Sequence, residues 1–178
     1  MTREQFRQYA TKTSTIITIL WIPSVLVLYF TLGKKIKELL FYRKKKYISQ
    51  RKKWRISFDY SKNNWQYTIW KDALLFDLKF SKASWDSIHI YKDPPSIEWL
   101  TVVSKKESIK EIKDASKYEM SSRSDTPQEW ELVVLKNIYG NYCVIKIIDV
   151  KDRKRSDDKD EVTFEYCINV DWYTDFSD

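Results

Sequence analysis

An uncharged segment of twenty-one residues, 13–33, lies between Lys12 and Lys34 near the start of this chain. A helix rises about 1.5 Å per residue, so this segment would extend about 30 Å, which is the thickness of a bilayer's hydrocarbon core. No other part of the sequence is comparably apolar. The segment therefore predicts a single transmembrane helix, preceded by an N-terminal flank at residues 1–12.

The charges on either side of this segment predict its orientation. Residues 1–12 have a net charge of +2, whereas residues 34–55 hold eleven basic residues and one acidic residue. Lys and Arg beside a membrane span are retained in the cytoplasm, so we expect the N-terminus outside the inner (cytoplasmic) membrane and the remainder in the cytosol. A cleaved signal peptide is the alternative, but its apolar core is usually shorter, about 7–15 residues, and residues 31–33 make a poor cleavage site.

One face of the predicted span carries hydroxyl groups and then apolar side chains. Because residues at i, i+4 and i+7 share a helical face, this face comprises Thr11, Thr15, Thr18, Ile22, Val25 and Tyr29. The hydroxyls could line a water-filled lumen, bond a neighbouring helix, or bond back to carbonyls of their own helix. A single helix encloses no pore, so a pore would require a homo-oligomer.

A basic stalk at residues 34–51 follows the span and is expected to continue the helix. Its cations are candidates for a pore mouth or for contact with lipid or RNA, and they are Lys34, Lys35, Lys37, Arg43, Lys44, Lys45 and Lys46. Tyr42, Tyr47 and Trp54 are interleaved with them, as in proteins that bind single-stranded nucleic acid. The position directly below a span favours anionic lipid and topology as the reason for this charge.

Residues 52–178 are expected to form one cytosolic domain, with seven of the eight tryptophans of the chain. Short runs of alternating apolar and polar residues predict strands at 54–60, 65–70, 73–80, 85–91, 97–103, 129–137, 141–150 and 161–170. Residues 141–150 are apolar on both faces, which places them centrally, whereas 161–170 has one polar face and predicts a sheet with one solvated side.

One soluble helix is expected at residues 104–120, because Ser104 and Glu107 match a capping box and an apolar stripe follows them. The predicted fold class is therefore α+β. It comprises a single transmembrane helix with a helical stalk and a cytosolic, antiparallel β-rich domain, either a sheet or a small barrel, with one helix.

The sequence offers few residues for catalysis or for a cofactor. His89 is the only histidine and lies in an apolar strand, where a structural role is the ordinary one. One histidine and two cysteines are too few for a structural zinc site, and two glycines exclude a Walker loop. Cys143 and Cys167 fall on strands expected to pair, and reduced core thiols are expected for them in the cytosol. We predict no catalytic residue, metal or cofactor.

Two acidic segments leave alternatives open. The connection at residues 151–160 and its flanks hold carboxylates that could bind a divalent cation, but they alternate with Lys and Arg, which favours a salt-bridged hairpin tip. The tail at residues 171–178 combines acidic residues with Trp172, Tyr173 and Phe176. It is either a docking peptide or a last edge strand.

The chain has a single predicted span at residues 13–33, a basic stalk at 34–55 and then a Trp- and Tyr-rich domain. This layout resembles that of the small membrane-anchored accessory proteins of type VI-B CRISPR systems, which accompany an RNA-guided RNase. The resemblance is one of layout over the whole chain. It implies a homo-oligomeric membrane pore that strengthens antiphage defence when the RNase is activated. A divergent ribonuclease motif proposed for that family, Arg followed by His after four to six residues, is missing, since Arg55 is the nearest arginine upstream of His89.

These features favour a non-enzymatic, homo-oligomeric pore or effector that depolarises the membrane in antiviral defence. Its expected partners are membrane lipid, further copies of the chain, and an upstream RNA-guided RNase or the RNA products of that RNase. The alternatives are a membrane-anchored sensor of cyclic nucleotides and a plain membrane adaptor. In a sensor, tryptophans such as Trp65, Trp70, Trp85 or Trp99 could stack on bases, and they could equally belong to the core.

Overall fold

The computed structural model describes residues 3–5, 7, 32–33, 47–104, 108–119 and 122–177. The chain divides into two compact units, Met1–Lys46 and Tyr47–Asp178. Within the first unit the described residues are helical, and no helix in the described parts of the chain is long and apolar enough to cross a membrane. The predicted span and most of the predicted stalk lie outside the described residues.

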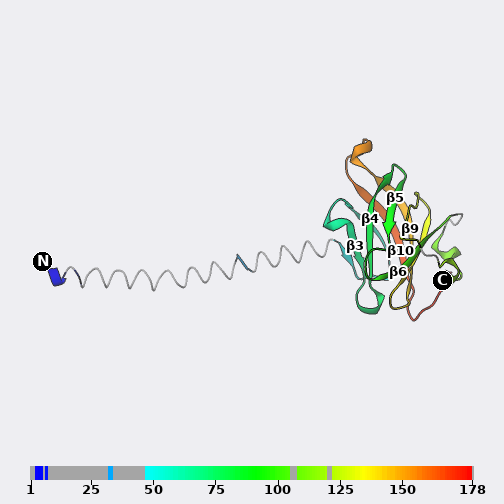
Figure 1. The fold of residues 1–178 in the computed structure, drawn as a ribbon, viewed down its shortest axis with the longest axis horizontal. Coiled ribbons are helices and arrows are strands. Elements are labelled where there is room, and N and C mark those ends of the chain that lie inside the picture. Colours follow the sequence, from blue (N-terminus) through cyan, green and yellow to red (C-terminus); the bar gives the residue numbers. More distant parts are fainter. Residues whose placement is uncertain are drawn as a thin grey trace. The chain divides into compact units, whose positions relative to one another are not determined.

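The described part of the second unit contains ten strands in two five-stranded sheets (Figure 1). The first sheet has the order β1 (Ile48–Ser49), β3 (Gln66–Ile69), β4 (Phe76–Ser84), β5 (Ser87–Tyr91) and β7 (Ser124–Asp125). The second has the order β2 (Lys53–Phe58), β10 (Glu161–Ile168), β9 (Tyr142–Lys151), β8 (Leu132–Asn137) and β6 (Ile97–Val103). Neighbouring strands are antiparallel except for β1 and β3, which are parallel. The predicted β-rich domain is confirmed as two packed sheets.

Aromatic rings from both sheets form the centre of the core between them. Phe58 and Phe164 come from the second sheet, and Tyr67 and Phe80 come from the first. The Phe58 ring centroid lies 5.0 Å from that of Tyr67 and 5.7 Å from that of Phe80, and Phe80 lies 5.7 Å from Phe164. All four side chains are buried. Tilted and edge-on contacts of this kind stabilise the packing beyond the area that they bury.

Strand β9 is central in the second sheet, as its continuous apolar run predicts. Cys143 and Ile145 face the core between the sheets, whereas Val144 faces a second apolar cluster on the outer side. Cys167 pairs with Val144, one residue out of register from Cys143, so the two cysteines point to opposite faces and both are free thiols. Burial raises the pKa of the Cys143 thiol well above its ordinary value, so this thiol is inert.

The helix predicted at residues 104–120 is wrong within the described part of that segment. Two 3-10 turns, η3 (Ile109–Glu111) and η4 (Ala115–Tyr118), stand in its place. The capping box belongs to Ser108 and Glu111 rather than to Ser104 and Glu107. A helix fails here because the backbone bonds the C-terminal tail instead: the N–H of Phe176 donates to the carbonyl of Ile112 at 2.8 Å, and the N–H of Ala115 to that of Thr174 at 2.8 Å.

These turns and the tail cover part of the outer face of the second sheet. Ile112, Ala115 and Phe176 are buried against Trp99 and Val144. The predicted solvated face is therefore present along β10, where Glu165 Oε1 lies 3.7 Å from Arg55 Nη1. It does not extend over β6, β8 and β9. The tail is neither an edge strand nor a free peptide, since Phe176 belongs to this cluster.

The folded unit begins earlier than residue 52, the predicted start of the domain. The carbonyls of Tyr47 and Ser49 accept hydrogen bonds from the N–H groups of Thr68 and Trp70, at 2.9 and 2.7 Å. Residues 47–51, assigned from sequence to the stalk, therefore belong to the sandwich. Strand β4 also starts later than predicted, because Asp72–Leu74 forms a 3-10 turn.

Candidate functional site

The pore residues expected from the sequence lie outside the described part of the chain. This holds for the predicted lumen (Thr11, Thr15, Thr18, Ile22, Val25 and Tyr29) and for the predicted mouth (Lys34, Lys35, Lys37, Arg43, Lys44, Lys45 and Lys46). Both sets stay predictions. The described domain contributes two other features, a partly buried ion-pair cluster and an exposed aromatic patch, at opposite ends of the strands.

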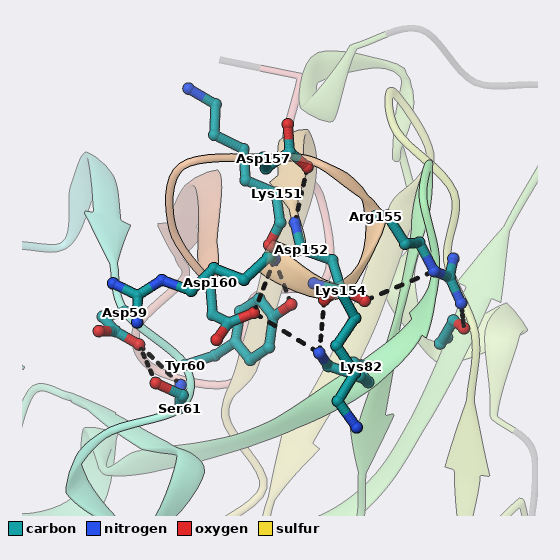
Figure 2. Close-up of polar contacts among 12 residues, drawn as sticks. Asp59, Tyr60, Ser61, Lys82, Lys151, Asp152, Lys154, Arg155, Asp157 and Asp160 are labelled. Carbon is teal, nitrogen blue, oxygen red and sulfur yellow. Dashed lines mark hydrogen bonds and ion pairs between the residues drawn. The ribbon is translucent and has the colours of Figure 1, made fainter.

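The first feature is a cluster around a lysine from β4 and the hairpin that joins β9 to β10 (Figure 2). Lys82 Nζ lies 2.5 Å from Asp152 Oδ1 and 3.6 Å from Asp160 Oδ1. Arg155 Nε lies 3.5 Å from Asp152 Oδ2, and its Nη2 donates to the carbonyl of Ala83 at 2.7 Å. We call Lys82, Asp152, Arg155 and Asp160 the Lys82–Asp152 cluster.

The carboxylates of this hairpin also bind its backbone. Asp152 Oδ1 accepts from the N–H of Lys154 at 2.9 Å, and Asp157 Oδ2 accepts from the N–H of Asp152 at 2.7 Å. Asp160 Oδ1 accepts from the N–H of Arg153 at 3.1 Å. These bonds fold the nine-residue connection, 152–160, into a compact loop. They also give one oxygen of each of these three carboxylates a backbone donor from the chain itself.

Electrostatics fixes the charge of the cluster. Burial opposes ionisation of Asp152, but hydrogen bonds from Lys82 and from the Lys154 N–H, with the charges of Lys82 and Arg155, outweigh it and lower the pKa of that carboxyl. The hydrogen bond to Asp152 raises the pKa of Lys82. Tyr60 donates to the carbonyl of Lys151 at 2.9 Å, and burial together with the nearby carboxylates raises its pKa. At neutral pH both Asp152 and Lys82 are therefore charged.

This arrangement fastens the hairpin to the first sheet. The Lys82 ammonium occupies the position among the carboxylates that a cation would take. No group of three His, Cys, Asp or Glu residues in the described chain is arranged to hold a metal ion. The interpretation of residues 151–160 as a salt-bridged hairpin tip agrees with this geometry.

His89 has one hydrogen-bond partner, since its Nδ1 lies 2.8 Å from Thr126 Oγ1. Its ring also lies beside that of Tyr91, with centroids 6.2 Å apart. Among the described residues, no carboxylate hydrogen-bonds to its second nitrogen. A hydroxyl and an imidazole without an orienting third group do not make an activated nucleophile. His89 joins β5 to the segment after β7.

The second feature is built on the turn between β8 and β9, which a buried asparagine organises. Asn137 Nδ2 donates to the carbonyls of Ala73 and Leu75 at 2.8 and 3.2 Å. Its Oδ1 accepts from the N–H groups of Tyr139 and Asn141 at 3.0 and 2.9 Å. All four hydrogen-bonding positions of the amide are therefore used. Asn137 thus joins the β8–β9 turn to the loop that precedes β4, and Asn141 Nδ2 adds a further bond to the carbonyl of Ala73 at 2.8 Å.

A second turn, at Val170–Tyr173, packs on the first one. The N–H of Tyr173 donates to the carbonyl of Val170 at 3.2 Å, and Trp172 Nε1 donates to the carbonyl of Tyr139 at 3.0 Å. Gly140 has φ +82°, and a Cβ there would lie 3.0 Å from Trp172 Cδ1. Glycine is thus required both by the backbone conformation and by the indole that covers it.

The two turns together expose a patch of large apolar side chains. Ile138, Tyr139, Trp172 and Tyr173 are each at least half exposed, and we call them the aromatic patch. Trp and Tyr are the residues most enriched at the centres of protein interfaces. Adjacent exposed residues of this kind mark a contact surface more often than isolated ones do.

Backbone strain accompanies this exposure. Trp172 has φ +61° and its neighbour Asp171 has φ +57°, and Trp65, Trp70 and Trp130 also have positive φ. A bulky residue in this region is an outlier, and such outliers concentrate at functional sites. The chain has two glycines, so other residues must occupy most turns of this type. Trp99, considered above among tryptophans that could stack on bases, is buried in the outer cluster.

Sequence reasoning found these features only in part. The acidic aromatic tail and the turn at residues 139–141 were both visible, but nothing in the sequence joins them. Lys82 was missed because it lies 70 residues from Asp152. The available signal was the position of Lys82, which continues the buried face of β4 (Phe76, Leu78 and Phe80) with a charged residue.

Comparisons with models of protein families, with curated protein sequences and with solved structures found no match to this chain. The function of the chain must therefore be inferred from its own residues.

Proposed function

We propose that this chain is a membrane-anchored, homo-oligomeric effector whose spans surround a pore and whose β-sandwich holds the subunits together. The observation that carries the proposal is the uncharged segment at residues 13–33 with the basic segment that follows it. Such a segment is long enough to span a bilayer, and the positive charge after it retains the rest in the cytosol.

The sandwich supports the oligomeric part of the proposal. Apolar helices gain little from burial against each other in lipid, whereas apolar surface on a domain in water gains from contact. The aromatic patch provides such surface. Oligomerisation by the sandwich would bring several spans into one ring, with Thr15 and Thr18 facing the lumen.

The resemblance in layout to the accessory proteins of type VI-B CRISPR systems suggests antiphage defence as the setting. In that setting an activated RNA-guided RNase would act upstream, and the pore would depolarise the inner membrane. A membrane adaptor is the second candidate, because the aromatic patch would serve equally to dock another protein.

Light scattering with negative-stain images of the full-length protein in mild detergent tests the proposal. A closed ring of several protomers is expected, and a monomer would contradict the pore. Flux through liposomes then tests conduction. Replacing both Thr15 and Thr18 by Leu should lower the flux without changing the mass of the assembly, and unchanged flux would remove both residues from the lumen.

A further inference from the structure

The aromatic patch carries negative charge at its margin. Asp171 and Asp175 lie next to it along the chain and are exposed. Neither forms an ion pair with a lysine or arginine of the described residues. The patch therefore combines four large apolar side chains with two carboxylates. Its best complement is a surface that offers apolar contact together with exposed cations.

A surface of that kind exists on the same domain, at the start of β2. This strand is last in the order of the second sheet, so one of its edges has no neighbouring strand in the described domain. Arg51, Lys52 and Lys53 are exposed there, and no described carboxylate pairs with either lysine. Trp54 is half exposed, with the Arg51 guanidinium 3.5 Å above its ring. We call Arg51, Lys52, Lys53 and Trp54 the basic edge.

We propose that the aromatic patch of one copy docks against the basic edge of a second copy. The two surfaces have opposite charge, and each offers exposed aromatic rings to the other. Trp, Tyr and Arg are the side chains that contribute most to binding energy at interfaces. A membrane anchor would also keep copies of the chain together in two dimensions, which raises their effective concentration.

Two copies that exchanged both contacts would close as a two-fold dimer, whereas one contact per pair repeats head-to-tail from copy to copy. A head-to-tail chain has one free patch at one end and one free edge at the other until the last copy closes the circle, and contacts of this type produce rings or filaments. A ring is the arrangement that a pore requires. This inference rests on the proposed homo-oligomer and specifies the surfaces that build it.

Strain in the second turn fits a docking role. Asp171 and Trp172 both have positive φ, a conformation that is disfavoured for every residue other than glycine. The fold accepts this cost and keeps the Trp172 ring exposed over the β8–β9 turn. An indole held in place by a hydrogen bond loses little further freedom on binding.

The test exchanges charge between the two surfaces in the full-length protein in mild detergent. One variant reverses the patch (Asp171→Lys with Asp175→Lys), a second reverses the edge (Lys52→Glu with Lys53→Glu), and a third combines all four changes. Each reversal alone should reduce the mass from light scattering to that of a single chain, and the combined variant should recover the wild-type mass. Near-UV circular dichroism establishes that every variant is folded.

A matched pair of aromatic variants tests the apolar part of the contact. Tyr173→Ala removes a patch side chain that makes no hydrogen bond to the described residues, and it should also reduce the mass. Trp85→Ala removes the most exposed tryptophan of the described residues, on the turn between β4 and β5 at the other end of the strands, and should not reduce the mass. Equal effects of the two substitutions would contradict docking at the patch.

The outcomes separate this inference from the proposed function. An oligomeric wild type whose mass survives both charge reversals would overturn the docking surfaces and leave the pore intact. Folded reversals that dissociate but do not recover when combined would likewise overturn the pairing of patch with edge. A monomeric wild type would overturn the homo-oligomer itself.

Discussion

Replacing Asn137 by Ala should destabilise the sandwich more than any other change to a single polar side chain at this end of the strands. The amide makes four hydrogen bonds to backbone groups and its residue is fully buried. A hydrogen bond contributes about 1 kcal/mol net, so four lost bonds amount to about 4 kcal/mol. For a domain of this size such a loss lowers the melting temperature by about 12–20 °C.

Thermal unfolding of the full-length protein in mild detergent, followed by near-UV circular dichroism, measures this effect. Asn169→Ala is the matched control, because the Asn169 amide makes one exposed hydrogen bond, to the carbonyl of Asp175. Asn169→Ala should lower the free energy of unfolding by no more than about 1 kcal/mol. If Asn137→Ala melts at the temperature of the control, the amide does not hold the turn to the loop before β4, and the reasoning fails.

Gly140→Ala should lower the free energy of unfolding by about 1–3 kcal/mol, because alanine disfavours φ +82° and its Cβ would lie 3.0 Å from Cδ1 of Trp172. An unchanged denaturation midpoint would contradict this. Lys82→Met should cost about 1–2 kcal/mol, less than a fully buried pair, because the Lys82 side chain is 36% exposed. The pKa of Asp152 is lowered from 3.8 in the folded protein, so its ion pair stabilises the fold above that pH and this stabilisation is lost on acidification. The difference in melting temperature between wild type and Lys82→Met should therefore shrink below about pH 4. A difference that stays constant with pH would refute the role of this ion pair. Mild oxidation should not link Cys143 to Cys167, because they face opposite sides of the sheet, and a band of altered mobility on a non-reducing gel would contradict their register.

The strands that sequence reasoning predicted best are those with one buried and one polar face. Along β10, Val162, Phe164 and Tyr166 are buried as their alternation requires, and β9 is central as its two apolar faces require. The period of the apolar–polar alternation and the length of the run determine such strands, because a shift by one residue would turn every side chain to the wrong face of the sheet.

The features that sequence reasoning missed depend on contacts between distant segments. The helix expected around Ile112 failed because the tail, more than 60 residues later, bonds its backbone, and tertiary contacts of this kind override local propensity. The partnership of Lys82 with Asp152 depends on how two sheets pack. The aromatic patch depends in the same way on one indole, Trp172, which bonds the carbonyl of Tyr139, 33 residues earlier.

The place of β2 in the second sheet has a consequence for how this protein is made. Its only neighbouring strand in the described domain is β10, so β2 has to wait for a partner that the ribosome delivers about 100 residues later. At about 5–20 residues per second, this delay lasts about 5–20 s. The N-terminal segment leaves the ribosome well before then, so if it spans a membrane as proposed, an insertase would have time to act on it before the sandwich closes. A chain truncated anywhere before residue 161 would leave both edges of β2 unpaired. Such a chain would be prone to aggregation and to proteolysis.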